Sequence, residues 1–201
     1  MENNEIDYSL RFLLLGYTGV GKTSLFYRFM CGEFKEKCLS TIGIDVRTKL
    51  LNIEDKIIKI MIYDIGFQDH YQFPPKHYYI SSHGCAIIYD INNRISFEYV
   101  KKCIDSIELN QQNDIRKILI GNKNDLDSER ERKVTMEEGK KLADEYNMNF
   151  IETSAKNDYN IKEAFELLVK DIIKNNKYLK NNKLQLKKND NKKNRKEKCI
   201  K

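Results

Sequence analysis

Long apolar runs, paired cysteines and histidine clusters are all missing from this chain of 201 residues. No stretch of 18 apolar residues occurs, so the sequence predicts no membrane-spanning helix. The segment before Ser9 is acidic and rich in asparagine and lacks the apolar core of a secretion signal. The five cysteines form no Cys-x-x-Cys pair and have no histidine at ligand spacing. This argues against structural zinc and a disulfide framework and favours a reducing cytosol.

Charge is distributed unevenly along the chain. Residues 174–201 hold eleven Lys and one Arg against Asp190 and Glu197, a net charge of +10, which leaves −4 for the rest. This basic segment has few apolar residues and cannot bury enough surface to offset the entropy of ordering, so we expect it to be disordered. The sequence therefore predicts an N-terminal extension over residues 1–8, one domain over 9–174 and a basic disordered tail over 175–201.

Between the two ends, apolar runs alternate with amphipathic stretches, which predicts an α/β fold with a mostly parallel sheet and helices on both faces. The short link at residues 54–56 predicts a hairpin, so one strand should be antiparallel. The six expected strands are Leu10–Leu15, Ile44–Ile53, Ile57–Tyr63, Cys85–Tyr89, Ile115–Ile120 and Asn149–Ile151. Helices are expected to begin at Lys22, near Pro75, at Ser96, at Thr135 and at Asn160.

Two of these helix starts carry capping signals. Thr135 with Glu138 has the Ser/Thr-x-x-Glu form of a capping box. Asn160 offers a side-chain cap with Glu163 three residues later.

A glycine-rich stretch from Gly16 to Thr23 has the form Gly-x4-Gly-Lys-Thr, follows an expected strand and opens an expected helix. This is the phosphate-binding P-loop pattern in the structural context that it requires. Glycines let backbone N–H groups face the phosphates, and the helix N-terminus adds partial positive charge. Lys22 should reach the β- and γ-phosphates, and the Thr23 hydroxyl should coordinate Mg²⁺. The phosphate-binding residues expected here are Gly19, Val20, Gly21, Lys22, Thr23 and Ser24.

A second motif, Asn122-Lys123-Asn124-Asp125, directly follows an apolar strand. Side chains at the carboxyl end of a parallel strand point into the ligand crevice. An Asp carboxylate can accept two hydrogen bonds from the N1–H and exocyclic amine of guanine, a donor pair that adenine lacks. The stretch from Glu152 to Lys156 follows the last short strand in the same way.

These three elements occur in the order and spacing of the Ras superfamily of small GTPases, and the resemblance covers roughly residues 9–174. It implies the P-loop GTPase fold, with GTP or GDP and Mg²⁺ as ligands. It also implies that Lys123 packs on the base, that Asp125 reads guanine, and that the Ala155 amide and Lys156 complete the pocket. The base-binding residues expected on this ground are Asn122, Lys123, Asp125, Ser154, Ala155 and Lys156.

The longer strings in this chain look like segments of the Rab family. They are Ser40–Asp45, Lys59–Asp64, Tyr78-Tyr79 and Tyr89–Phe97. In the family, an aromatic residue at the position of Phe34 packs against guanine. The Thr at the position of Thr41 coordinates Mg²⁺ and senses the γ-phosphate, which gives an order–disorder switch.

After the third strand, the chain departs from the family pattern. Asp64 remains to hold Mg²⁺ through water, and Gln68 remains to orient the attacking water. Phe67, however, stands where the family has a glycine, with Gly66 one place earlier. A side chain disfavours the backbone states that glycine allows. We therefore hypothesise that GTP sensing or hydrolysis is impaired, or uses a switch geometry hinged at Gly66.

The effector-facing aromatic triad of the family is also altered. Val46 stands where Phe is expected and Tyr63 where Trp is, while Tyr78 or Tyr79 holds the third place. This leaves the identity of the effector open.

The basic tail carries Cys199 third from the last residue, which fits neither the two terminal cysteines usual in Rabs nor a Cys-a-a-X box. Cys199 is a candidate for lipidation, and the lysines favour attraction to anionic lipids. Nucleic-acid binding by the tail is the competing interpretation, but no aromatics interleave the lysines and no RNA-binding motif accompanies them.

The leading interpretation is a Rab-like GTPase that switches between GTP and GDP states in membrane trafficking, on the cytosolic face of an internal membrane. It would act with an exchange factor, a GTPase-activating protein (GAP) and effectors. Intrinsic hydrolysis should be slow, because no arginine finger is evident in cis. The alternative is a nucleotide-binding scaffold that no longer hydrolyses GTP and recruits partners. A P-loop kinase or ATPase fits less well, since it leaves the second and third motifs unexplained.

Overall fold

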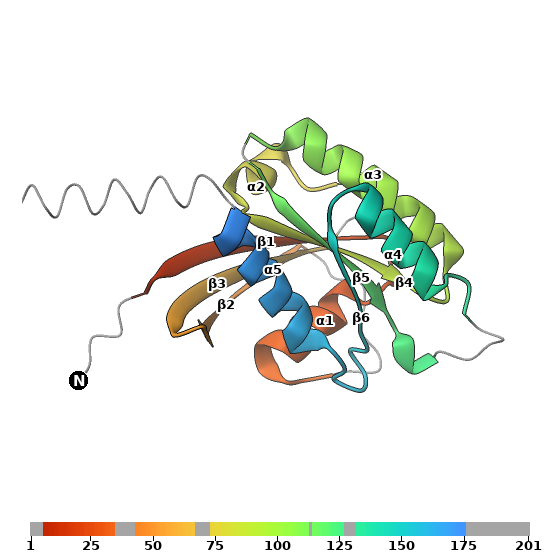
Figure 1. The fold of residues 1–201 in the computed structure, drawn as a ribbon, viewed down its shortest axis with the longest axis horizontal. Coiled ribbons are helices and arrows are strands. Elements are labelled where there is room, and N and C mark those ends of the chain that lie inside the picture. The colour runs from red at the N-terminus through yellow and green to blue at the C-terminus, as the bar shows by residue number, and fades with distance from the viewer. Residues whose placement is uncertain (1–5, 35–42, 67–72, 113, 127–131, 176–201) are drawn as a thin grey trace, which may run out of the picture.

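A six-stranded sheet forms the centre of the computed structural model, which describes residues 6–34, 43–66, 73–112, 114–126 and 132–175 (Figure 1). The strand order is β2-β3-β1-β4-β5-β6. Only β2 runs antiparallel to its neighbour β3, and the other pairs are parallel. The strands are β1 (Tyr8–Leu15), β2 (Ile44–Ile53), β3 (Lys56–Ile65), β4 (Gly84–Asp90), β5 (Arg116–Asn122) and β6 (Asn149–Glu152). The predicted α/β fold is confirmed.

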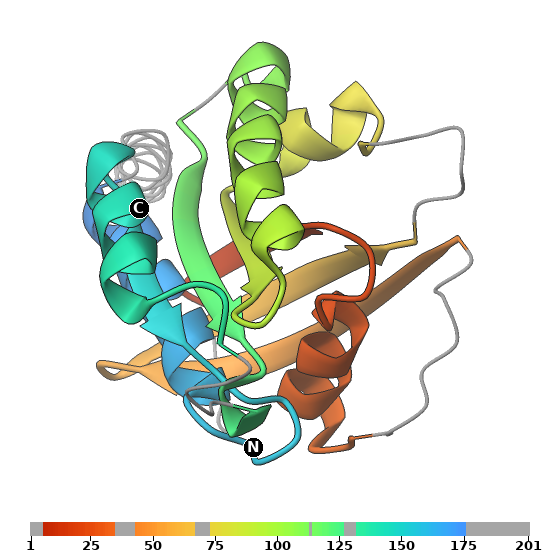
Figure 2. The same ribbon diagram turned by 90° about the vertical axis from the view of Figure 1, so that its right-hand side faces the viewer.

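Helices cover both faces of this sheet. The described helices are α1 (Lys22–Cys31), α2 (Lys76–Ser81), α3 (Arg94–Asn110), α4 (Met136–Glu145) and α5 (Ile161–Asn175), with a 3₁₀ turn at Asn124–Leu126. Helices α1 and α5 lie on one face and α2, α3 and α4 on the other (Figure 2). Each face has its own apolar core: Phe29 stacks on Phe165 in the first, and Tyr89 packs edge-on against Phe97 in the second.

The predicted hairpin joins β2 and β3 through a tight turn. Glu54 and Asp55 have φ angles of 52° and 58°, and the flanking residues Ile53 and Lys56 are paired. Two consecutive positive φ angles are typical of the turn whose twist matches that of antiparallel strands. This turn makes β2 the edge strand of the sheet.

One predicted helix start is wrong. Helix α3 begins at Arg94 rather than at Ser96, because the Asn93 side chain caps it by accepting a hydrogen bond from the Ser96 N–H at 3.2 Å. Ser96 itself is buried in the first turn, and its hydroxyl donates to the Asn93 carbonyl at 2.7 Å. The sequence pattern placed the start at the first serine and overlooked the asparagine before it.

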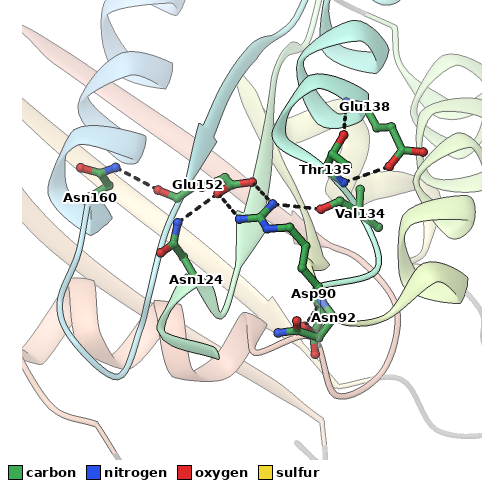
Figure 3. Close-up of polar contacts among 9 residues, drawn as sticks. Asp90, Asn92, Asn124, Val134, Thr135, Glu138, Glu152 and Asn160 are labelled. Carbon is green, nitrogen blue, oxygen red and sulfur yellow. Dashed lines mark hydrogen bonds and ion pairs between the residues drawn. The ribbon is translucent and has the colours of Figure 1, made fainter. Parts of the chain in front are cut away.

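The two capping predictions differ in outcome. At α4 the capping box is confirmed: the Glu138 N–H donates to the Thr135 hydroxyl at 3.2 Å, and the Thr135 N–H donates to the Glu138 carboxylate at 2.9 Å (Figure 3). Ahead of α5, the Asn160 side-chain amide instead donates to the backbone carbonyl of Glu152 at 2.9 Å. Asn160 therefore ties the last strand to the start of α5.

The parallel strands place several polar residues at one edge of the sheet. The P-loop follows β1. Asp64 is the second-last residue of β3, and the last residues of β4, β5 and β6 are Asp90, Asn122 and Glu152. Because the carboxyl ends of parallel strands meet at the same edge, these residues surround one crevice. Among the described residues, no helix is long and apolar enough to cross a bilayer.

Candidate nucleotide-binding site

The P-loop wraps closely around its neighbours at two glycines. Gly16 has φ 145°, and a Cβ there would lie 2.1 Å from the Ile88 carbonyl oxygen. Gly21 has φ 95°, and its Cβ would lie 2.5 Å from Nδ2 of Asn122. Both positions require glycine for space as well as for backbone conformation. The contact at Gly21 also brings the phosphate loop against the base-binding motif.

Lys22 opens α1 and points back across the loop. Its ammonium donates to the backbone carbonyls of Gly16 and Tyr17, each at 3.0 Å. Burial lowers the pKa of Lys22, and the Asp64 carboxylate opposes that shift. A partly buried cation held against the loop, beside the helix N-terminus, is a site for an anion such as a phosphate.

Asp64 has the donor chemistry of a magnesium site. It is fully buried, and neither carboxylate oxygen makes a well-formed hydrogen bond among the described residues, although the Thr23 side chain and the Lys22 ammonium interact with it. Burial raises the pKa of Asp64, while the Thr23 side chain and the Lys22 ammonium lower it. Buried polar atoms without partners are rare in folded proteins, so this carboxylate calls for a cation or water. Together with the Thr23 hydroxyl it offers oxygen ligands, which Mg²⁺ prefers.

The base-binding motif is fixed to the P-loop and to the loop after β6. The Asn122 amide donates to the Val20 carbonyl at 2.9 Å and accepts from the Thr153 hydroxyl at 3.2 Å. The Ser154 hydroxyl donates to the Asp125 carboxylate at 2.5 Å. The Ser154 bond holds the Asp125 carboxylate in one orientation, and both of its oxygens keep lone pairs that could accept further hydrogen bonds.

Lys123 has an unusual backbone and a carboxylate partner. Its φ is 69°, and its ammonium lies 2.7 Å from an oxygen of Asp90 at the end of β4. This ion pair holds the lysine stem across the crevice, where its methylene groups would face a planar base.

Arg28 connects Phe34, which follows α1, with the loop after β6. Its guanidinium donates to the backbone carbonyls of Ala155 and Lys156 at 2.8 Å and 3.1 Å. It also lies 5.6 Å from the centre of the Phe34 ring. Arg28 thereby brings Phe34, Ala155 and Lys156, three residues predicted for the base pocket, to one place.

Behind the base loops lies a buried ion pair. The Arg132 guanidinium donates to both oxygens of Glu152 at 2.9 Å, and Glu152 is only 4% exposed. The Asn124 amide donates to the same carboxylate at 3.0 Å, and Arg132 also donates to the Val134 carbonyl (Figure 3). This network joins the segment after β5 to the end of β6, so it braces both loops of the base pocket.

Four residues singled out from the sequence lie outside the described residues: Thr41, Phe67, Gln68 and Cys199. Their roles stay predictions. For the aromatic triad, the structure distinguishes the two tyrosines. Tyr79 is buried and its hydroxyl meets the Ser106 hydroxyl at 3.1 Å, whereas the Tyr78 ring packs edge-on against Tyr63 at 5.5 Å. Tyr78 therefore contacts Tyr63, which lies opposite Val46 in the register of β2 and β3.

Comparison with known proteins places this pocket in a family. The Ras family profile matches residues 11–174. The chain is 39% identical over 180 residues to the Ras-related protein Rab-8 of Diplobatis ommata, covering 89% of this chain and 85% of that protein. It is 39% identical over 167 residues to human Rab-8B (83% and 80%) and 38% identical over 169 residues to mouse Rab-15 (84% and 79%). The chain belongs to the Ras superfamily, as a small GTPase of the Rab type.

Sequence reasoning missed several residues that lie in or support this candidate site. Asp90 could have been found, because it follows an apolar run just as Asn122 does. Arg28 and Arg132 carry no such signal, since each lies far along the chain from the groups that it contacts. Only the folded topology brings them to the base loops.

Proposed function

We propose that this Rab-type GTPase binds GTP and GDP together with Mg²⁺ and acts as a membrane-trafficking switch with slow intrinsic hydrolysis. The observation that carries this proposal is the partly buried Lys22 at the P-loop together with the buried Asp64 carboxylate, whose oxygens lack a well-formed hydrogen bond among the described residues. Lys22 would bind the β- and γ-phosphates, and Thr23 and Asp64 would hold the metal, Asp64 through water. When bound, Mg²⁺ neutralises negative charge that develops on the phosphates.

The base would be held by Asp125 from its edge and by the Lys123 stem and Phe34 from its faces. Gln68 would orient the attacking water, and Thr41 would sense the γ-phosphate; both assignments rest on the family motif. Arg28 donates to the loop after β6 and Arg132 donates to Glu152, so we expect a GAP to supply the charge that accelerates hydrolysis.

The basic tail supports a place on the cytosolic surface of an internal membrane. Each Lys or Arg near an anionic surface contributes about 1 kcal/mol before screening. Lipid attached at Cys199 would add to that attraction. Exchange factors, a GAP and effectors would then meet the GTPase at the membrane.

The direct test is to purify the full chain, denature it and identify the released nucleotide by chromatography. GDP as the main species would show that the Phe67-containing segment still supports hydrolysis. GTP as the main species would favour the alternative function, a scaffold held in one state. Release of no guanine nucleotide, together with failure to bind added GTP or GDP, would contradict the proposal.

The metal assignment predicts that Mg²⁺ slows GDP release through Asp64. Chelating Mg²⁺ should speed release about tenfold or more from the natural protein, which corresponds to ~1.4 kcal/mol of lost stabilisation. The same treatment should change release from Asp64→Asn less than about twofold, because an amide is a poorer ligand for a hard cation. Release of a fluorescent GDP analogue, followed after a chase with unlabelled GDP, measures both rates. An equal response of the two proteins to chelation would argue that Asp64 does not hold the metal.

A further inference from the structure

An aromatic stack joins the phosphate-binding loop to the segment that leads into α2. The Tyr17 ring in the P-loop lies edge-on to Tyr99 on α3, with ring centroids 5.3 Å apart and planes at 66°. Tyr99 in turn stacks on Phe73, with centroids 5.6 Å apart and planes at 11°. Tyr99 therefore contacts two segments that are distant in the sequence.

On the α2 side, the stack fixes a stiff stretch of chain. Phe73 is followed by Pro74, which is buried, and by Pro75, which immediately precedes the first residue of α2. Proline restricts its own φ and the conformation of the residue before it, so the position of Phe73 is passed on to the start of α2. A movement of the first turn of α2 should therefore also move the Phe73 ring.

On the P-loop side, one residue has two roles. The Tyr17 backbone carbonyl accepts a hydrogen bond from the Lys22 ammonium at 3.0 Å, while its side chain packs on Tyr99. Movement of the Tyr17 ring would displace the carbonyl that helps to hold Lys22 over the phosphates. Tyr17 thus contacts Tyr99 through its side chain and Lys22 through its backbone.

Tyr99 itself is suited to a packing role. Burial raises the pKa of its hydroxyl to about 12, so the ring is neutral at physiological pH. The Lys102 ammonium lies 5.8 Å from the ring centroid, within cation–π distance. The stacked and edge-on geometries of the two ring pairs are those that aromatic pairs prefer.

We propose that Tyr99 is a positioning residue that couples the entrance of α2 to nucleotide retention in the P-loop, through Tyr17 and Phe73. This inference rests on the proposed function, since it concerns the same phosphate site. It places a determinant of nucleotide release at Phe73, a residue outside the pocket.

The test measures release of a fluorescent GDP analogue from the full chain. Tyr99→Ala and Phe73→Leu should each speed release about three- to tenfold, the size expected when an aromatic pair is lost. Tyr99→Phe keeps the ring and should stay within about twofold of the natural protein. Both substitutions break the contact between Tyr99 and Phe73. The double variant should therefore release GDP about as fast as Tyr99→Ala alone, rather than at a rate that multiplies the two single effects.

Tyr146→Ala is the matched control, since Tyr146 is also a partly buried aromatic packed against the same core. Release from this variant should stay within about twofold of the natural rate. Multiplicative effects in the double variant, an unchanged rate in Phe73→Leu, or a Tyr99→Phe protein as fast as Tyr99→Ala would each overturn the coupling. Failure of the natural protein to bind the GDP analogue would instead refute the proposed function.

Discussion

Replacing Asp125 with alanine should lower the affinity for GDP about 100- to 20,000-fold. The Ser154 hydroxyl donates to this carboxylate at 2.5 Å, and in the proposed function the carboxylate accepts two hydrogen bonds from guanine. Hydrogen bonds to a charged group contribute ~1.5–3 kcal/mol each, and each 1.4 kcal/mol is tenfold in affinity, so loss of two bonds gives the expected range. Calorimetric titration of nucleotide-free protein with GDP measures the effect.

Base selectivity sharpens this test. Inosine diphosphate lacks the exocyclic amine of guanine, so the natural protein should bind it about tenfold or more weakly than GDP. Asp125→Ala should bind the two nucleotides about equally, because no carboxylate remains to accept a hydrogen bond from the exocyclic amine. Asp105→Ala removes the same charge from an exposed position on α3 and serves as the control. If Asp125→Ala kept the guanine preference of the natural protein, the assignment of Asp125 would fail.

The fold was predictable because its signals are local. Alternating apolar runs and amphipathic stretches located all six strands, and the structure extends most of them by only a few residues. The start of α3 was misplaced because Asn93 and Ser96 can both cap a helix, and only the backbone shows which one does. Where two nearby residues can both cap a helix, the sequence alone therefore cannot fix the residue at which the helix begins.

The site was predictable where one short motif supplies both the backbone shape and the chemistry. Lys22 and Asp125 are of this kind, since each lies within such a motif. The residues that support the pocket could not be predicted in this way. Arg28, Arg132 and Tyr99 contact groups that are distant in the sequence and that only the folded topology brings near. Likewise, a pair of adjacent tyrosines could not be told apart until burial showed that Tyr79 faces the core.

Replacing Arg132 with methionine should lower the free energy of unfolding by about 3–5 kcal/mol. Methionine keeps much of the apolar stem but leaves the Glu152 carboxylate buried without its cation, and stranding a buried charge in this way has a cost of that size. A domain of this kind has a total stability of only about 5–15 kcal/mol, so the loss would be severe. Urea unfolding at a fixed GDP concentration measures it, because bound ligand also stabilises the fold.

Two controls separate the buried charge from other effects. Arg94 forms a comparable ion pair with Glu138 at 2.6 Å, but its side chain is 47% exposed, so Arg94→Met should lower the free energy of unfolding far less than Arg132→Met. Adding Glu152→Gln to Arg132→Met removes the stranded charge and should recover part of the lost stability. An Arg132→Met protein no less stable than Arg94→Met would show that the buried pair does not brace the pocket. The buried pair holds the two base loops together, so its loss should also speed GDP release, whereas Arg94→Met should leave release unchanged.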